Sequence, residues 1–335
     1  MSDAEQSYLV KTISGQSRGA ALGAWIGWLV RATGPLLGLL LLCLVLSLTT
    51  DSFLTVNNLL NVLDQATVLG IMAIGMTFVI LIGGIDLSVG ALLAVSTMVM
   101  GTLNANFGVP LPIAVLGGVT AAAIGGFANG VLVVRLGVPA FVATLAMMSI
   151  ARGVANLITN GTQITGYPFW FSELSIIRYG GLLSATVALF ILLALISGLI
   201  LSYHSIGRKV YAIGGGAEVA RLAGINVKKY TTMIYVLCGI TAGIGGVVLA
   251  TRLDSSEPSA GLGWELDVIA AVVIGGGSLS GGVGTIGGTV IGVLIIGVLR
   301  NGLNLIGISP FIQQIVIGAV IAVAVIIDQL RLRRG

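Results

Sequence analysis

Residues 203–229 read YHSIGRKVYAIGGGAEVARLAGINVKK and form the longest hydrophilic run after the N-terminus. Long apolar segments flank this run on both sides. It contains five of the sixteen Lys and Arg residues, and Glu218 is its one acid. Basic loops between membrane-spanning helices stay on the cytoplasmic side of a membrane. The run therefore predicts a cytoplasmic loop that fixes the orientation of the segments around it.

The loop has internal structure, because the glycines at 214–216 interrupt it and a short helical pattern follows. Gly224 then ends the pattern, as a glycine after a helix commonly does. Glu218, Ala220 and Gly224 resemble the EAA loop of bacterial ABC importer permeases, with Val219 in place of the middle alanine. The resemblance implies a coupling helix that sits in a groove of an ATPase subunit, and a basic loop without a partner is the alternative. The coupling candidates are Arg208, Lys209, Glu218, Arg221 and Gly224.

The composition predicts a membrane protein. Hydrophobic residues make up 56% of the chain, charged residues 8%, and the mean hydropathy is +1.10. A soluble domain carries roughly 25% charged residues, so this chain cannot cover itself with a polar surface and lipid must be its main solvent. The 50 glycines suit close helix packing and broken helices in a membrane. The sequence has no basic stripe with interleaved aromatics, so we expect no nucleic-acid partner.

The few reactive side chains do not indicate an enzyme, a cofactor or a metal site. Cys43 and Cys238 lie inside apolar runs with no second ligand nearby, which disfavours a disulfide or a metal. His204, the only histidine, adjoins a predicted helix end, where we expect a cap or interface role. An intramembrane enzyme would need paired acids, a metal cluster or a nucleophile with a base, and the sequence offers none of these.

The apolar segments predict an all-α integral membrane protein with about ten transmembrane helices, some of them short or broken, because a span needs about 20 apolar residues. The predicted spans are 34–50, 66–83, 87–104, 113–134, 140–159, 181–202, 230–251, 265–277, 284–300 and 310–328. We expect a single transmembrane domain over 1–335, with cytoplasmic tails at 1–33 and 329–335, a short interfacial helix at 51–65 and an aromatic-rich polar loop at 160–180.

The basic residues agree with this topology. Twelve of the sixteen Lys and Arg residues fall in segments assigned to the cytoplasm, Arg178 and Arg252 fall outside, and Arg152 and Arg300 lie within spans. The N-terminus shows no secretory signal, and the first apolar run has no small-residue cleavage site, so we expect that run to remain as a helix.

A nine-residue pattern occurs twice. Residues 82–90 read IGGIDLSVG and residues 274–282 read IGGGSLSGG, with six identical positions. Each follows one predicted span and precedes another, so we interpret the pair as a parallel repeat of a broken helix, which in transporters often borders the transport path. Asp86 matches Ser278, and Asp and Ser are both good N-caps. We therefore favour Asp86 as the cap of the third span over a proton or substrate site, which is the usual hypothesis for an acid at membrane depth.

Other polar side chains lie inside the spans at helical spacing. Asn156 follows Arg152 by four residues, and Asn304 follows Arg300 by four, so each pair shares a helix face. Two interpretations stay open: hydrogen bonds between helices, and a polar path for a hydroxyl-rich solute. The path candidates are Asp86, Ser88, Asn129, Arg152, Asn156, Asn301 and Asn304.

Four segments, taken together, carry a family resemblance. They are GIDLSVG (84–90), GRKVYAIGG…ARLAGINV (207–227), ELDVIAAVVIGGGSLSGG (265–282) and NGLNLIGIS (301–309). Over about residues 55–328 the chain resembles the ribose-type sugar ABC importer permeases, the membrane subunits for ribose, xylose, arabinose and galactose. It departs from the family at Gly216, where Asn is frequent, and at Gly277, where Thr is frequent, and both departures leave the substrate subfamily open.

The resemblance implies a permease homodimer in the bacterial inner membrane, with both termini cytoplasmic, an ABC ATPase at the coupling loops and a periplasmic sugar-binding protein. The chain has no G-x-x-x-x-G-K-[ST] motif, so we expect a non-catalytic subunit whose partner binds ATP. Alternating access would carry a monosaccharide inward, with ribose or another pentose favoured. An ion-coupled secondary transporter, and an ABC permease for a nucleoside or other small polar solute, are the alternatives. Asp254 and Glu257, on an acid-rich outer face, are candidates for docking the binding protein.

Overall fold

The computed structural model describes residues 34–332, with side chains described as far as residue 326. The predictions for the tail 1–33 and for residues 333–335 lie outside this part of the chain. Its helices are Gly34–Thr49, α2 (Val56–Leu81), α3 (Val89–Ala105), α4 (Leu111–Val134), α5 (Ala140–Thr159), α6 (Phe169–Ile176), α7 (Ala185–Tyr203), α8 (Ser205–Gly215), α9 (Ala217–Leu222), α10 (Val227–Leu253), α11 (Trp264–Ile274), α12 (Ile286–Leu305) and α13 (Pro310–Leu332). Two antiparallel pairs of two-residue strands complete it, β1 (Ile164–Thr165) with β4 (Ser255–Ser256) and β2 (Arg178–Tyr179) with β3 (Leu183–Ser184).

The all-α membrane fold is confirmed. Within residues 34–332, six helices are long and apolar enough to span a membrane, namely α2, α4, α5, α7, α10 and α12. Three shorter apolar helices accompany them, at Gly34–Thr49, α3 and Pro310–Ile326. Large side chains on α7 such as Leu192, Leu195 and Leu199 are more than half exposed, as expected of a surface that faces lipid.

Three predicted segments differ in the structure. The predicted interfacial helix at 51–65 and the second span form one helix, α2, because Thr55 caps its start and neither proline nor glycine interrupts it before Gly70. The predicted span 265–277 is the 11-residue helix α11, since the glycines that begin at Gly275 end it. At 1.5 Å per residue α11 covers about 16 Å, roughly half of a bilayer core. In addition, α13 continues to Leu332, into the tail predicted from residue 329.

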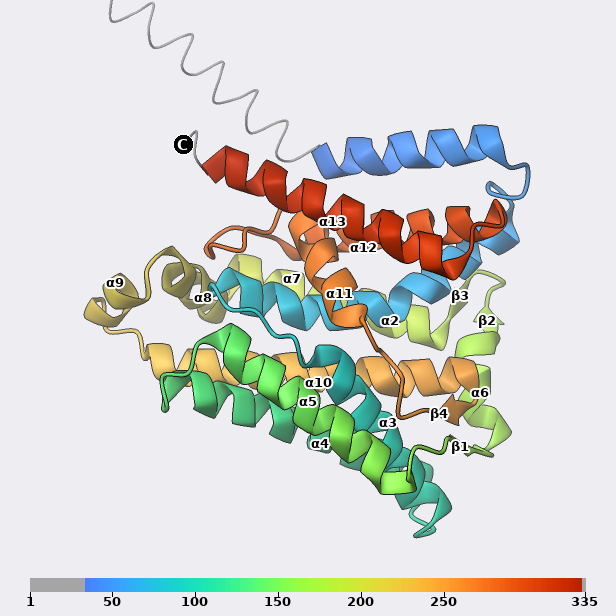
Figure 1. Cartoon of the computed structure of the whole chain (residues 1–335), viewed down its shortest axis with the longest axis horizontal. Helices are drawn as coiled ribbons and strands as arrows, with labels where there is room; N and C mark the ends of the chain where they lie inside the picture. The colour runs from blue at the N-terminus through green and yellow to red at the C-terminus, as the bar shows by residue number, and fades with distance from the viewer. Residues whose placement is uncertain (1–33, 333–335) are drawn as a thin grey trace, which may run out of the picture.

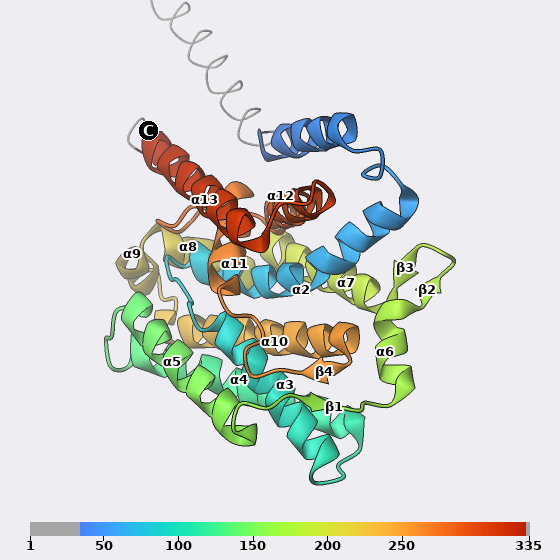
Figure 2. The ribbon, with the colours of Figure 1, turned by 45° about the vertical axis from the view of Figure 1, so that its right-hand side comes forward.

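The helices form three layers (Figures 1 and 2). The helix Gly34–Thr49, α12 and α13 make one outer layer, α3, α4, α5 and α10 make the other, and α2 and α7 lie between them with α11. The helices α8 and α9 lie at one end of the molecule, called here the loop end, and β1–β4 with α6 lie at the opposite, strand end (Figure 1). Residues 66–81 of α2 are all buried, so this helix forms the centre of the core.

Small residues bring α4 and α10 into backbone contact. A Cβ on Gly126 of α4 would overlap the carbonyl oxygen of Tyr235, and a Cβ on Gly239 of α10 would overlap that of Ala122. Close approach through small residues is how helices associate in lipid, where no hydrophobic effect drives them together. The many glycines of the sequence thus serve packing as well as turns.

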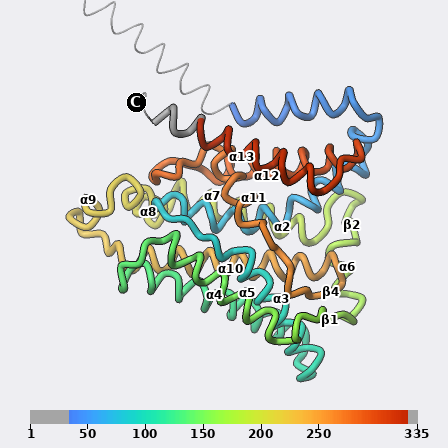
Figure 3. Tube along the Cα trace, viewed as in Figure 1, coloured from blue at the N-terminus to red at the C-terminus, as the bar shows by residue number. Residues whose placement is uncertain are grey.

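Two non-helical segments run into the interior from opposite ends (Figure 3). Residues 82–88 lead back from the loop end to the start of α3, and residues 254–263 lead back from the strand end to the start of α11. The two helix starts meet, since a Cβ on Gly90 would overlap the carbonyl oxygen of Gly261. Broken helices that start inside the bundle are typical of transporters, where they are tolerated beside protein or a cavity.

The two copies of the nine-residue pattern touch each other and α8. The Gly282 N–H donates to the Leu81 carbonyl oxygen at 2.8 Å. The Cβ position of Gly214, in the last turn of α8, would overlap both of these groups. The Tyr211 hydroxyl of α8 donates to the Gly284 carbonyl oxygen at 2.8 Å. We call this contact of α8 with the end of α2 and with the second copy the glycine junction; it links the polar loop to the residue before the first copy and to the connection between α11 and α12.

Candidate solute path and coupling surface

Three of the path candidates form one buried cluster. The carboxylate of Asp86 accepts hydrogen bonds from the Ser88 N–H at 2.8 Å and the Ser88 hydroxyl at 2.6 Å. The Asn129 amide of α4 donates to the Ser88 hydroxyl oxygen at 2.8 Å. All three side chains are fully buried, and the Asn129 Oδ1 and the nearby Tyr235 hydroxyl have no hydrogen-bond partner among the described residues. The cluster ties the break before α3 to α4.

The position of the helix cap differs from the prediction. The N-cap of α3 is Ser88, so Asp86 is not the cap residue. Its carboxylate instead fixes the turn before the helix, through the N–H two residues later. Ser278 accepts in the same way from the Ser280 N–H, at 3.4 Å. The prediction that Asp86 caps the third span is therefore wrong; Asp86 and Ser278 instead each accept from the N–H two residues later in a turn.

Arg152 holds the segment that runs in from the strand end. Its Nη1 donates to the carbonyl oxygens of Pro258 and Ala260, at 2.6 and 2.9 Å. Both acceptors lie in the 254–263 connection, and Arg152 itself lies on α5. A guanidinium suits this position, because the two N–H groups of one terminal nitrogen can serve two acceptors at once. Arg152 thus positions the segment that leads into α11.

Two adjoining cavities lie beside this segment. The larger, of about 490 Å³, lies between the first half of α2, the end of α10 and the second half of α12. We call it the Trp264 cavity. Its polar or aromatic lining residues are Gln65, Arg252, Glu257, Trp264, Arg300 and Asn304. The second, of about 440 Å³, lies between α11, α12 and α13, and Trp264 and Arg300 line it too. Arg300 forms an ion pair with the buried carboxylate of Asp267 on α11.

The remaining path candidates lie apart from one another. Asn156 is exposed on α5 and donates only to the Arg152 carbonyl oxygen in its own helix. Asn301 exchanges two hydrogen bonds with Asn58 of α2, at 2.9 and 3.0 Å, and so joins two helices. Asn304 lines the Trp264 cavity and accepts from the Gln313 amide at 2.7 Å. The seven candidates therefore do not form one continuous polar path in this structure.

The cavity contains residues that we did not predict as path residues. Trp264 is the first residue of α11, and the charged groups of Arg252 and Arg300 approach it from α10 and α12. The sequence did carry a signal for this site. A tryptophan precedes two acids at the start of a short apolar segment, and an intramembrane arginine lies further along the chain. This signal could not be used, because the proximity of these residues depends on how three helices pack.

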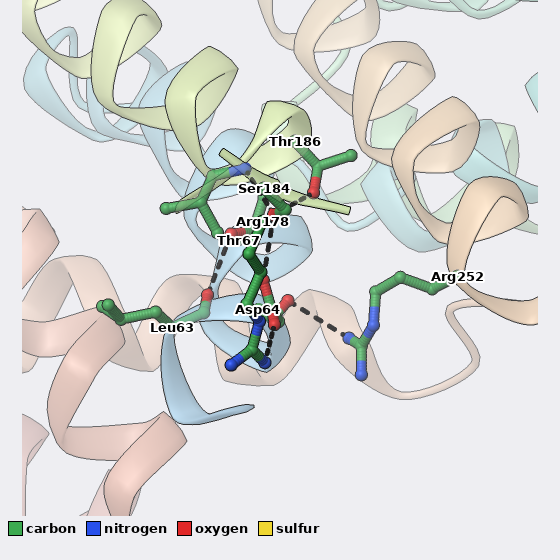
Figure 4. A network of polar contacts seen from close by, with 8 residues as sticks. Leu63, Asp64, Thr67, Arg178, Ser184, Thr186 and Arg252 are labelled. Atoms are coloured by element: carbon green, nitrogen blue, oxygen red, sulfur yellow. Dashed lines mark hydrogen bonds and ion pairs between the residues drawn. The ribbon is translucent and has the colours of Figure 1, made fainter. Parts of the chain in front are cut away.

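The strand end is held by ionic contacts (Figure 4). Arg178 of β2 pairs with the Asp64 carboxylate of α2 at 3.0 Å, and the Ser184 hydroxyl of β3 donates to the same carboxylate at 3.0 Å. Arg252 of α10 donates to the Asp64 carbonyl oxygen at 3.3 Å. Among the docking candidates, Asp254 is exposed and accepts from the Ser172 hydroxyl at 2.7 Å, whereas Glu257 faces the Trp264 cavity.

The coupling candidates lie on α8 and α9. The predicted short helix is confirmed as α9, and Gly224 follows it with a φ of +81°. The helix α8 was not predicted. His204 caps it, because its Nδ1 accepts a hydrogen bond from the Ile206 N–H at 3.2 Å, and this confirms the predicted cap role. On α8, the Lys209 ammonium donates to the Tyr230 hydroxyl at 2.6 Å, whereas Arg208 donates at 3.4 Å to the carbonyl oxygen of Tyr203, the last residue of α7.

The helix α9 presents an exposed apolar surface flanked by charge. Val219 and Leu222 are 72% and 76% exposed. Beside them, the Arg221 guanidinium donates to Glu218 at 3.0 Å and lowers the pKa of that carboxyl group. Large apolar side chains on a short, charged helix at the end of a bundle are typical of a protein-docking surface.

Comparison with known proteins agrees with this geometry. The sequence matches the family model described as branched-chain amino acid transport system / permease component over residues 58–325. The ribose import permease protein of Escherichia coli K12 is 43% identical over 304 residues, which cover 90% of this chain and 94% of the relative. A comparison with solved structures finds no match.

Two further relatives are named as permeases for other sugars. The L-arabinose ABC transporter permease protein of Azospirillum brasilense is 36% identical over 327 residues, or 92% of this chain and 90% of the relative. The D-allose transport system permease protein of E. coli K12 is 37% identical over 284 residues, or 85% and 87%.

Proposed function

Because this chain belongs to the permease-component family of branched-chain amino acid transport systems, we propose that it is the membrane subunit of an ATP-driven importer for a monosaccharide, with ribose or another pentose as the solute. The three relatives named above are permeases for ribose, L-arabinose and D-allose, and they match this chain over nearly their whole length. A permease subunit is not itself an enzyme, so ATP hydrolysis belongs to a partner chain.

The observation that carries the ATP-driven mechanism is the exposed apolar surface of α9. Val219 and Leu222 would enter a groove of the ATPase, and the Glu218–Arg221 pair would flank the contact. Force on α9 would pass to α8, which directly precedes α9 in the sequence and contacts the end of α2 and the second copy of the nine-residue pattern through the glycine junction. ATP-driven closure of two ATPase subunits would thus move a permease homodimer between outward-open and inward-open states.

A charge in the α9 surface tests this coupling. Leu222→Asp places a carboxylate in an apolar contact, and we expect the ATPase to dissociate from the permease during purification. Leu136→Asp is the matched control, because Leu136 is also a largely exposed leucine at the loop end, in the turn between α4 and α5. Retention of the ATPase by the Leu222→Asp variant would overturn the assignment of α9 as the coupling helix.

This mechanism assigns the two ends to the two sides of the bacterial inner membrane. The loop end, which carries the basic run 203–229, would face the cytoplasm together with both termini. The strand end would face a periplasmic sugar-binding protein, with Asp254 and Glu257 as acidic contacts. Asp254→Lys should weaken uptake and leave ATPase assembly intact, whereas unchanged uptake would remove Asp254 from the docking surface.

Uptake by reconstituted vesicles tests the whole proposal. The vesicles contain this permease with its ATPase, and the binding protein is added outside with labelled D-ribose, L-arabinose, D-allose or a nucleoside. We expect accumulation of one sugar that requires internal ATP and is insensitive to uncouplers. Accumulation that needs an ion gradient and no ATPase would establish a secondary transporter instead, and accumulation of the nucleoside alone would overturn the sugar assignment.

A further inference from the structure

The Trp264 cavity combines the groups that a sugar requires. Its volume of about 490 Å³ lies within the roughly 300–1,000 Å³ of small-molecule sites. An aromatic side chain stands beside two planar amides, Gln65 and Asn304, and beside charged groups from α10 and α12. A monosaccharide has C–H faces that pack against an aromatic ring and hydroxyls that both donate and accept hydrogen bonds. The lining matches both properties.

Arg300 keeps hydrogen-bonding capacity for a ligand. A guanidinium has five N–H donors. One nitrogen of Arg300 binds Asp267, and Nε is buried without a partner among the described residues. The side chain is about one third exposed and lines both cavities. The ion pair fixes the guanidinium between the cavities, where its remaining donors can serve a hydroxyl oxygen.

We propose that the Trp264 cavity is the site at which this permease holds a neutral, hydroxyl-rich monosaccharide on its way through the bundle, with Trp264 against the sugar ring and Gln65, Arg300 and Asn304 on its hydroxyls. The inference rests on the proposed import function and adds the contact residues. It also separates two roles, because Asp86, Ser88 and Asn129 line neither of the two cavities and instead hold the break before α3.

The position of the cavity suits a transport step. Its floor includes Ala260 and Gly261, which belong to the segment that Arg152 holds and that leads into α11. Gly261 in turn contacts Gly90 at the start of α3. A shift of the segment before α3, or of the connection that follows α11, transmitted from the glycine junction would therefore change the shape of the cavity. A site bounded by broken helices is where transporters commonly place their substrate.

Cysteine protection in the full importer tests the site. In a background with Cys43→Ser and Cys238→Ala, Asn304→Cys is labelled with a small maleimide, and Asn156→Cys is the control, because Asn156 is an exposed asparagine on α5 that lines neither cavity. The vesicles receive D-ribose, L-arabinose or D-allose with the binding protein and internal ATP. We expect the transported sugar to slow labelling of Asn304→Cys and to leave labelling of Asn156→Cys unchanged.

A second variant keeps the inference testable if the Asn304→Cys protein folds poorly. Trp264→Leu should reduce uptake between about twofold and tenfold, which is the range expected for loss of an aromatic contact. ATPase stimulation by the loaded binding protein should stay within about twofold of the parent, since the coupling surface is intact. Trp170→Leu is the control; Trp170 lies on α6 at the strand end, and its substitution should leave uptake unchanged.

The outcomes separate this inference from the proposed function. Suppose that the parent importer accumulates a sugar, that this sugar does not protect Asn304→Cys, and that Trp264→Leu does not alter uptake. The cavity is then not the site, and the import function stands. If the sugar protects Asn156→Cys instead, the path runs along α5 and the inference is overturned. If the parent accumulates none of the sugars, the proposed function fails and this inference fails with it.

Discussion

Two polar side chains, the buried Asp86 and the half-buried Arg152, hold the two broken segments of the bundle. Asp86 fixes the turn before α3, and Arg152 holds the connection before α11 through two backbone carbonyls. A buried polar group without its partner costs about 1–3 kcal/mol, and more when the group is charged. Substitutions at these residues should therefore act on the geometry of the breaks as well as on overall stability.

We expect Asp86→Ser to be tolerated and Asp86→Leu to be damaging. A serine can still accept from the Ser88 N–H, as Ser278 does from Ser280 in the second copy. A leucine leaves that N–H and the Asn129 amide group without their carboxylate acceptor, at a cost of about 1–3 kcal/mol for each. Thermal unfolding of the purified protein and vesicle uptake measure the difference. Equal loss of both properties in the two variants would contradict the turn role.

Arg152→Lys should loosen the 254–263 segment, because the lysine side chain is one bond shorter and its ammonium would not reach the position of Nη1, which serves both Pro258 and Ala260. Loss of a hydrogen bond from a charged donor costs about 1.5–3 kcal/mol. Hydrogen exchange followed by mass spectrometry should show faster exchange in this segment. The control, Asn156→Ala on the same helix, removes only a bond within α5 and should leave exchange there unchanged. Protection equal to the parent in Arg152→Lys would rule out this holding role.

At the scale of elements, the glycine junction is the contact through which α8 meets the end of α2 and the connection between α11 and α12. At Gly214 it is built from backbone against backbone, so no flexible side chain could move aside there. Overpacking of a close contact costs about 1–3 kcal/mol where the surroundings can partly adjust, and backbone groups adjust least.

Neighbouring glycines in α8 give a matched pair of variants. Gly214→Ala would place a methyl group against the Leu81 carbonyl and the Gly282 N–H. We therefore expect the variant to lose about 1–3 kcal/mol of stability and to lose ATP-driven uptake. Gly215→Ala meets nothing within 4 Å and should be neutral or slightly stabilising, since alanine favours helix. Thermal unfolding and uptake of both variants decide, and equal behaviour would show that α8 does not pack tightly at this point.

At the scale of the whole molecule, the distribution of charge defines two different ends. The loop end carries the five basic residues of 203–229, whereas acids and bases neutralise each other at the strand end, as in the Asp64–Arg178 pair. Positive charge is retained on the cytoplasmic side of membrane proteins. The orientation in the membrane therefore follows from this rule and from the proposed partners.

Cysteine labelling in intact cells tests the orientation. Lys228→Cys lies exposed at the loop end, and Asn106→Cys lies exposed after α3, beyond the opposite end of the bundle. In a background without the native cysteines, a membrane-impermeant maleimide should label Asn106→Cys at once and Lys228→Cys only after the inner membrane is permeabilised. The reverse pattern would place the basic run outside and exclude its contact with a cytoplasmic ATPase.

The sequence alone determined that the protein lies in lipid, which family it belongs to, and where most of its helices begin and end. Apolar runs of about 20 residues must be helical in lipid, because the bilayer offers no hydrogen-bond partner to an open backbone, and α5 begins and ends at the predicted residues. Local contacts at helix ends could also be predicted from the sequence: Gly224 ends α9, and His204 caps α8. These features depend on neighbours within a few positions along the chain.

Only the tertiary structure decided which polar residues share a site. Asn301 was a path candidate by its place in a span, but it pairs with Asn58, which is 243 residues away along the chain. Trp264 and Arg300 come together because α11 is a half-length helix whose start meets α12 beside a cavity. Such proximity depends on how glycine-rich helices pack and where they break. Local periodicity determines which face of a helix is apolar, but it does not determine which neighbour that face will meet.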